Sequence, residues 1–188
     1  SSKIFNQSLL DKDFLKPQAF HSSPIARSGG MASIISLIIF FVSYYFLFNI
    51  FLIDYLILSF SFFFLGFLDD LKINIDPKLR LVSMIVILCL GINYFSIYIQ
   101  SVDLKFLSFW LSNNYFKKFF ILLCFLFIIN GSNLIDGFNG LLGMHLLIIN
   151  VVLLSINIAN LELASIIIAQ IIVLLCFLLF NFPKAKIF

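Results

Sequence analysis

The residues best suited to chemistry in this chain include two adjacent carboxylates at the end of an apolar run. Asp69 and Asp70 stand in the segment GFLDDLK. Adjacent carboxylates repel each other, and a divalent cation, a proton or a nearby basic group relieves that repulsion. The alternative is a solvated helix terminus, although carboxylates at the C-terminal end of a helix oppose its macrodipole. The pair is therefore a candidate catalytic or metal-binding site.

Two amides and a third carboxylate follow each other at a helical spacing in the segment NGSNLIDGFNG. Asn130 and Asn133 lie three residues apart, and Asp136 extends the same stripe if the helix continues. Such a stripe near a membrane boundary suits hydrogen bonding to a polar ligand, and polar contacts between helices are the alternative. The glycines that follow indicate a tight turn before the next apolar run.

Two further polar segments flank apolar runs. KPQAFHSSPIARSGG, which contains His21 and Arg27, leads directly into an apolar run, and its two final glycines allow a close approach of the backbone to a ligand or a helix. Asn181 begins the segment NFPKAKIF, in which Pro183 ends the last apolar run. Each segment by itself is also compatible with a basic flank beside a membrane.

The composition decides what kind of elements must position these polar groups. The chain has 188 residues, of which 62% are hydrophobic and 11% are charged, whereas about 25% of the residues in a soluble domain are charged. A soluble fold of this length would lack the polar surface to cover so many apolar side chains. The net charge of +3 is small and scattered, and it does not indicate nucleic-acid binding. We therefore expect an integral membrane protein in contact with the lipid bilayer.

Six apolar stretches approach the length of about 20 residues that crosses a bilayer. They cover residues 31–53, 54–68, 80–100, 118–135, 141–159 and 162–182. The first two merge around Asn49 to Asp54. The sequence therefore predicts an all-α fold, a polytopic transmembrane helical bundle of about six spans that forms a single domain over residues 1–188.

The distribution of Lys and Arg predicts the orientation of these spans. If residues 1–30 lie in the cytoplasm, the basic residues on that side are Lys3, Lys12, Lys16, Arg27, Lys72, Lys78, Arg80, Lys184 and Lys186. The opposite side then holds only Lys105, Lys117 and Lys118. Basic residues are enriched on the cytoplasmic side of membrane proteins, so this bias favours six crossings and places all four polar segments at the cytoplasmic face.

Taken together, the four segments resemble the motifs of the polyprenyl-phosphate N-acetylhexosamine-1-phosphate transferases, membrane enzymes of the glycosyltransferase family 4 type. The first motif is matched by Asp13, His21, Pro24, Arg27, Gly29 and Gly30. The second, with its continuation, is matched by Gly66, Phe67, Asp69, Asp70, Pro77, Lys78, Arg80 and Leu81. The third is matched by Asn130, Asn133, Asp136, Gly137, Gly140 and Leu141, and the fourth by Asn181 onward. Four ordered motifs are far more specific than a lone pair of aspartates.

The chain also departs from the family pattern. Gln18 and Ala19 stand where many members carry Arg-Lys, and Asn139 stands where many bacterial members have a second Asp. The family has a G-D-x-G-S loop directly after the position of Phe188, a later His-rich loop and a span before the position of residue 1. We therefore expect the sequence to be a fragment that lacks an N-terminal span and a C-terminal part.

The resemblance implies an enzyme that transfers a sugar-1-phosphate from a UDP-sugar to undecaprenyl phosphate and releases UMP. The UDP-sugar would be a UDP-N-acetylhexosamine, with GlcNAc, GalNAc or a deoxy-amino sugar as the transferred group. The reaction would be the first membrane step in the synthesis of a cell-surface polysaccharide, at the cytoplasmic face of the bacterial inner (plasma) membrane. Homodimers occur in the family.

The resemblance also implies roles for individual residues. Mg²⁺, or Mn²⁺ in its place, would bridge the diphosphate, and its candidate ligands and the candidate catalytic residues are Asp69, Asp70 and Asp136. The candidate substrate-binding residues are His21, Arg27, Asn130 and Asn133. Of the acidic pair, Asp69 is the preferred base or acceptor-positioning group, with Asp70 as support for the metal.

Two other functions compete with this interpretation. In a transporter or channel the polar residues would line the midplane and both faces of the membrane, whereas here they gather toward one face. A non-catalytic membrane scaffold is the second alternative. A G-D-x-G-S loop in the reading frame beyond residue 188 would favour the enzyme over both.

Overall fold

A computed structural model describes the chain at residues 10–11, 25–70, 76–97, 99, 102–135 and 138–187. These residues form two short strands, β1 (Leu10–Asp11) and β2 (Ile25–Ala26), and seven helices. The helices are α2 (Gly29–Phe48), α3 (Ile53–Asp70), α4 (Pro77–Tyr94), α5 (Lys105–Leu111), α6 (Asn114–Ile135), α7 (Leu141–Asn157) and α8 (Leu161–Asn181). The predicted all-α membrane bundle is confirmed.

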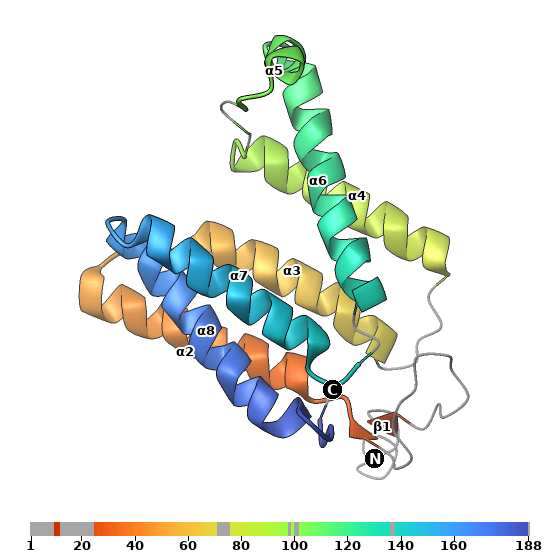
Figure 1. The fold of residues 1–188 in the computed structure, drawn as a ribbon, viewed down its shortest axis with the longest axis vertical. Coiled ribbons are helices and arrows are strands. Elements are labelled where there is room, and N and C mark those ends of the chain that lie inside the picture. The colour runs from red at the N-terminus through yellow and green to blue at the C-terminus, as the bar shows by residue number, and fades with distance from the viewer. Residues whose placement is uncertain are drawn as a thin grey trace. The chain divides into compact units, whose positions relative to one another are not determined.

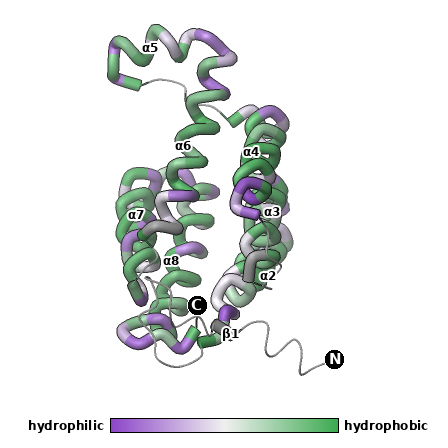
Figure 2. Tube along the Cα trace, turned by 90° about the vertical axis from the view of Figure 1, so that its right-hand side faces the viewer, coloured by the Kyte–Doolittle hydropathy of each residue, from purple (hydrophilic) through white to green (hydrophobic). Residues whose placement is uncertain are grey.

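Most of these helices are suited to a membrane. Within the described residues, α2, α4, α6 and α8 are long and apolar enough to cross one, and α3 and α7 are shorter apolar helices. Large hydrophobic side chains stay exposed all along them, as at Phe46, Phe127 and Leu179, each at least 76% exposed. Helices that are apolar on all sides require a lipid environment. Figure 2 shows hydrophobic residues along most of each long helix.

Six of the helices, α2, α3, α4, α6, α7 and α8, match the six predicted stretches in order, but their bounds differ. The first predicted stretch, 31–53, is too long, because α2 ends at Phe48 and Asn49 adopts a left-handed conformation with φ 55°. A residue in this conformation is a common helix terminator. The third stretch, 80–100, is shifted, because α4, capped by Asp76, begins at Pro77, three residues before the predicted start, and the helix ends at Tyr94. The predicted count of six crossings remains a prediction.

The described residues divide into two compact units, and the prediction of a single domain over the whole chain remains a prediction. The first unit contains the strands and α2, α3, α7 and α8, and the second contains α4, α5 and most of α6. In the first unit α7 and α8 form an antiparallel hairpin, and α2 packs against both α3 and α8. Phe41, Tyr44, Leu52 and Ile166 form its buried core.

The ends of the four helices of the first unit lie in two groups, one at each end of the unit (Figure 1). We call the end at which α2 and α7 begin and α3 and α8 finish the motif end, marked by Gly29, Asp70, Gly140 and Asn181. The other end, at which α2 and α7 finish and α3 and α8 begin, is the opposite end. The arrangement follows from the short connections between consecutive antiparallel helices, residues 49–52 and 158–160.

In the second unit, the short helix α5 lies between α4 and α6 in the chain. The Trp110 ring of α5 lies 5.6 Å from the Phe116 ring of α6. The end of α4 meets the start of α6 through a hydrogen bond of 2.6 Å, which the Lys118 ammonium donates to the Asn93 side chain. A ring contact thus joins α5 to α6, and a side-chain hydrogen bond joins α4 to α6.

Candidate functional site

The motif end of the first unit contains a part of each of the four polar segments. The amide stripe of α6, which belongs to the third segment, is not among these parts. The helix that follows the first segment begins there, the helix with the acidic pair ends there, and the glycine turn of the third segment meets the fourth segment there (Figure 1). The ends of these four helices thus lie together within this unit, and the convergence of the polar side chains at one face remains a prediction.

The first segment enters the fold through a small antiparallel sheet. Leu10 pairs with Ala26 and Asp11 with Ile25, and Ile25 is buried. Arg27 follows β2 directly, is half-buried, and stands two residues before α2 begins. The sheet therefore holds the backbone directly before Arg27 in place. His21 lies outside the described residues.

Asp69 and Asp70 are the last two residues of α3. Among the described residues, the last turn of this helix contains no basic residue, and two acidic residues therefore end the helix at the terminus where the macrodipole disfavours negative charge. The predicted position of the pair at a helix terminus is confirmed. A cation or proton supplied from elsewhere would stabilise the pair, which is the property expected of a metal or acid–base site.

The amide stripe belongs to the second unit. Asn130 and Asn133 lie three residues apart in α6, which continues to Ile135, so the helical condition for a shared stripe is met. The Asn130 side chain donates a hydrogen bond of 2.8 Å to the Leu126 carbonyl in the preceding turn. Asp136 lies outside the described residues, and the convergence of this stripe with the acidic pair remains a prediction.

Asn181 is a residue to which the sequence interpretation gave no role. It ends α8 and is only 4% exposed. Its side-chain oxygen accepts from the Gly140 N–H at 2.5 Å, and its side-chain nitrogen donates to the Ile187 carbonyl at 2.8 Å. A polar amide at the end of an apolar helix, two residues before Pro183, is the signal that could have indicated a structural hydrogen bond here.

No metal site can be assembled from the described side chains alone. Among them, no group of three His, Cys, Asp or Glu residues lies close enough to hold a metal ion. The predicted ligands Asp69, Asp70 and Asp136 stand outside that set of side chains, so the prediction of a metal site stays open to experiment. Carboxylate oxygens are the ligands that Mg²⁺ prefers, which makes the donor chemistry of these three residues suitable.

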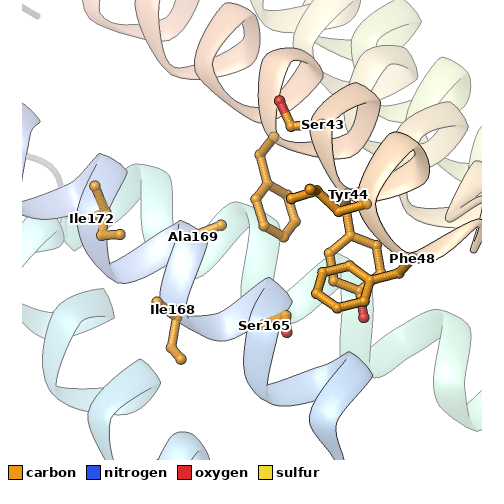
Figure 3. Close-up of a pocket in the computed structure, with 9 residues that line it drawn as sticks. Ser43, Tyr44, Phe48, Ser165, Ile168, Ala169 and Ile172 are labelled. Carbon is orange, nitrogen blue, oxygen red and sulfur yellow. The ribbon is translucent and has the colours of Figure 1, made fainter.

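A cavity of about 250 Å³ lies between α2 and α8, toward the opposite end of the first unit. Figure 3 shows Tyr44 and Phe48 of α2 facing Ser165, Ile168, Ala169 and Ile172 of α8. The described residues that line it carry hydroxyl groups but no charge. Its lining suits an apolar group and does not suit a diphosphate. The cavity therefore differs in chemistry from the candidate catalytic residues.

One comparison with known proteins identifies a family. The sequence model of glycosyl transferase family 4 matches residues 52–188 of the chain. The match covers the acidic pair, the amide stripe and Asn181, while the segment with His21 and Arg27 precedes it. No curated protein and no solved structure matches the chain.

Proposed function

The chain belongs to glycosyl transferase family 4, and on this premise we propose that it transfers an N-acetylhexosamine-1-phosphate from a UDP-sugar to undecaprenyl phosphate. The family and the apolar helices together make it an integral membrane transferase of the polyprenyl-phosphate sugar-phosphate type. The proposal adds the identity of the sugar class, of the lipid and of UMP as the leaving group. It is supported by the family match together with the polar residues that gather at one end of an otherwise apolar unit.

In the proposed reaction, a phosphate oxygen of undecaprenyl phosphate attacks the sugar-linked phosphorus of the UDP-sugar. The new bond is a phosphorus–oxygen bond of the lipid diphosphate, and the bond that breaks joins this phosphorus to the oxygen retained by UMP. Two anionic phosphates must approach each other, so catalysis depends on bringing positive charge between them. Arg27, half-buried beside the start of α2, is proposed to supply part of this charge together with His21.

The acidic residues are proposed to hold the reacting groups and a divalent cation. Asp69 would position the acceptor phosphate or take its proton, and Asp70 and Asp136 would hold Mg²⁺ or Mn²⁺. A bound cation of this kind stabilises negative charge on phosphoryl oxygens and on a leaving phosphate. Asn130 and Asn133 would orient the nucleotide through their side-chain amides.

The membrane geometry supports a reaction at the water–lipid boundary. Undecaprenyl phosphate carries its phosphate at the membrane surface, and UDP-sugars are soluble cytoplasmic molecules, so the two substrates can meet only at the inner face. The excess of basic residues on the same side as the polar segments favours that orientation. We therefore propose the bacterial inner membrane as the location, with the active site facing the cytoplasm.

A transporter is less compatible with the arrangement of polar groups. Substrate sites of transporters lie near the bilayer midplane, whereas the acidic pair and Asn181 stand at the ends of their helices. The cavity between α2 and α8 lies toward the opposite end of the unit, and its described lining is mostly apolar.

The decisive experiment is a transfer assay on the full-length protein in nanodiscs. Undecaprenyl phosphate, Mg²⁺ and a panel of UDP-sugars are supplied, and UMP and the lipid-linked sugar are measured together. We expect equal amounts of both products with one UDP-N-acetylhexosamine preferred. Release of UMP without a lipid product, or absence of both with every sugar, would contradict the proposal.

A further inference from the structure

The side chain of Asn181 joins two elements that meet at the motif end. Its oxygen accepts from the Gly140 N–H at 2.5 Å, and its nitrogen donates to the Ile187 carbonyl at 2.8 Å. Because the residue is only 4% exposed, water cannot readily replace either hydrogen bond when it is lost. A buried polar group left without its partner is destabilising, so these contacts hold their geometry tightly.

Gly140 also packs against the residue that follows α8, Phe182. It caps α7 in a left-handed conformation with φ 74°, which favours glycine. A Cβ atom at this position would lie 3.0 Å from Cβ of Phe182 and 3.1 Å from its Cδ2 atom. The backbone of Gly140 therefore packs directly against the residue after Asn181. The start of α7 can shift only if the end of α8 shifts with it.

The segment after Asn181 is tied to the first polar segment. The Lys186 N–H donates to the Phe180 carbonyl at 2.8 Å, which turns the chain back toward α8. Ile187 then forms a parallel bridge with Ala26, the residue before Arg27. Through the Ile187 carbonyl, Asn181 is thus connected to the strand that carries Arg27.

We propose that Asn181 is a positioning residue for the transfer reaction, which acts through the backbone of Gly140 and Ile187. Gly140 lies four residues after Asp136 in the sequence, and Ala26 directly precedes Arg27. One buried amide therefore holds the ends of two segments that carry candidate catalytic and substrate-binding residues. The inference rests on the proposed function, because the positioned residues are those assigned to the reaction.

Three variants of the full-length protein test this role by separating the two hydrogen bonds. Asn181→Ala removes both bonds. Asn181→Asp keeps an acceptor for the Gly140 N–H, beside the N-terminus of α7 where a negative charge is favourable, and loses the donor to Ile187. The matched control is Asn150→Ala, because Asn150 is also buried in the α7/α8 hairpin but donates to Leu146 within its own helix.

Two measurements are made on each variant in nanodiscs. Hydrogen exchange followed by mass spectrometry reports the protection of the Gly140 amide, and UMP release reports kcat and KM. We expect Asn181→Ala to expose the Gly140 amide to faster exchange and to lower kcat by about 10- to 100-fold, the size of effect produced by misplaced reacting groups. Asn181→Asp should keep most of the protection and an intermediate kcat, and Asn150→Ala should keep both even if it lowers the melting temperature.

The outcomes separate this inference from the proposed function. Fast exchange at Gly140 with unchanged turnover in Asn181→Ala would refute the positioning role. An Asn181→Asp protein with a protected Gly140 but no more activity than Asn181→Ala would place the amide on the substrate instead. A wild-type protein that protects Gly140 but transfers no sugar would refute the transfer reaction, and the positioning role with it, while leaving the hydrogen bond confirmed.

Discussion

The two ends of the first unit are built from the same helices but held together by different forces. At the motif end, α7 and α8 are joined by the hydrogen bond from Gly140 to the Asn181 side chain. At the opposite end, α2 and α8 face each other across an apolar cavity of about 250 Å³ lined in part by Tyr44 and Ala169. The side chain of Ser165 there donates to the Leu161 carbonyl of its own helix. Among the described residues of this unit, the side-chain hydrogen bonds between elements thus occur at the motif end.

This difference has a physical reason. Van der Waals packing helps to hold helices together in a membrane, but it is not directional. A site that must fix the positions of charged groups needs directional contacts between elements. Buried hydrogen bonds between segments are such contacts, and in the described part of this unit the Asn181 side chain forms two of them at the motif end.

The largest effect that would sharpen this comparison is expected from the acidic pair. Asp69→Asn and Asp70→Asn remove one negative charge each at the end of α3, and each should lower turnover by about 10²- to 10⁴-fold, as for loss of an acid–base or charge-stabilising group. Asp54→Asn is the matched control, because Asp54 lies in the first turn of the same helix at the opposite end. UMP release is measured for all three proteins.

Folding is checked in parallel by size-exclusion chromatography and thermal unfolding. Wild-type turnover in both Asp69→Asn and Asp70→Asn would remove the pair from the mechanism. A loss in Asp54→Asn as large as in the other two would show that the ends of α3 do not differ in function.

A smaller but still marked effect is expected for Gly140→Ala. An alanine at this position would have to adopt the left-handed conformation of Gly140, at a cost of about 1–2 kcal/mol. Its methyl group would also lie only 3.0 Å from Cβ of Phe182. Gly66→Ala is the control for stability, because among the described residues a Cβ at Gly66 meets nothing within 4 Å and alanine favours the helix. Thermal unfolding in detergent should give a lower midpoint for Gly140→Ala and an equal or higher one for Gly66→Ala. Equal losses would mean that the α7/α8 contact is not specific.

Particular elements show why some of this was predictable from sequence and some was not. The apolar runs predicted α2, α7 and α8, because burial in lipid needs long apolar helices whatever their neighbours are. The break at Asn49 was misplaced by several residues, since the apolar residues continue through it and only the left-handed backbone ends the helix. The bond between Asn181 and Gly140 joins residues 41 positions apart, a pairing that local patterns do not encode. The sequence did not predict the short helix α5, because the aromatic residues of Lys105–Leu111 are equally typical of a loop at a membrane interface.

At the opposite end, filling the cavity should raise stability without touching the reaction. Ala169→Val adds two methyl groups to the wall of the cavity, and cavity-filling changes commonly stabilise by about 0.5–2 kcal/mol. The unfolding midpoint of the full-length protein should rise, while kcat and KM for the UDP-sugar stay at their wild-type values. A fall in turnover with intact folding would show that the cavity takes part in the reaction and would remove the functional contrast between the two ends.

The smallest effect is expected for Ser165→Ala, beside the same cavity. The Ser165 hydroxyl donates at 2.7 Å to the Leu161 carbonyl, which is the carbonyl one turn earlier in α8 and stays within the helix when the hydroxyl is lost. We expect a change within about 0.5 kcal/mol in the free energy of unfolding, measured by chemical denaturation, and unchanged turnover. Asn181→Ala in the same helix should lose several times more stability, since its two bonds reach Gly140 and Ile187 outside the helix. If both variants lost the same free energy of unfolding, hydrogen bonds between segments would stabilise this fold no more than those within one helix. The proposed contrast between the two ends would then be wrong.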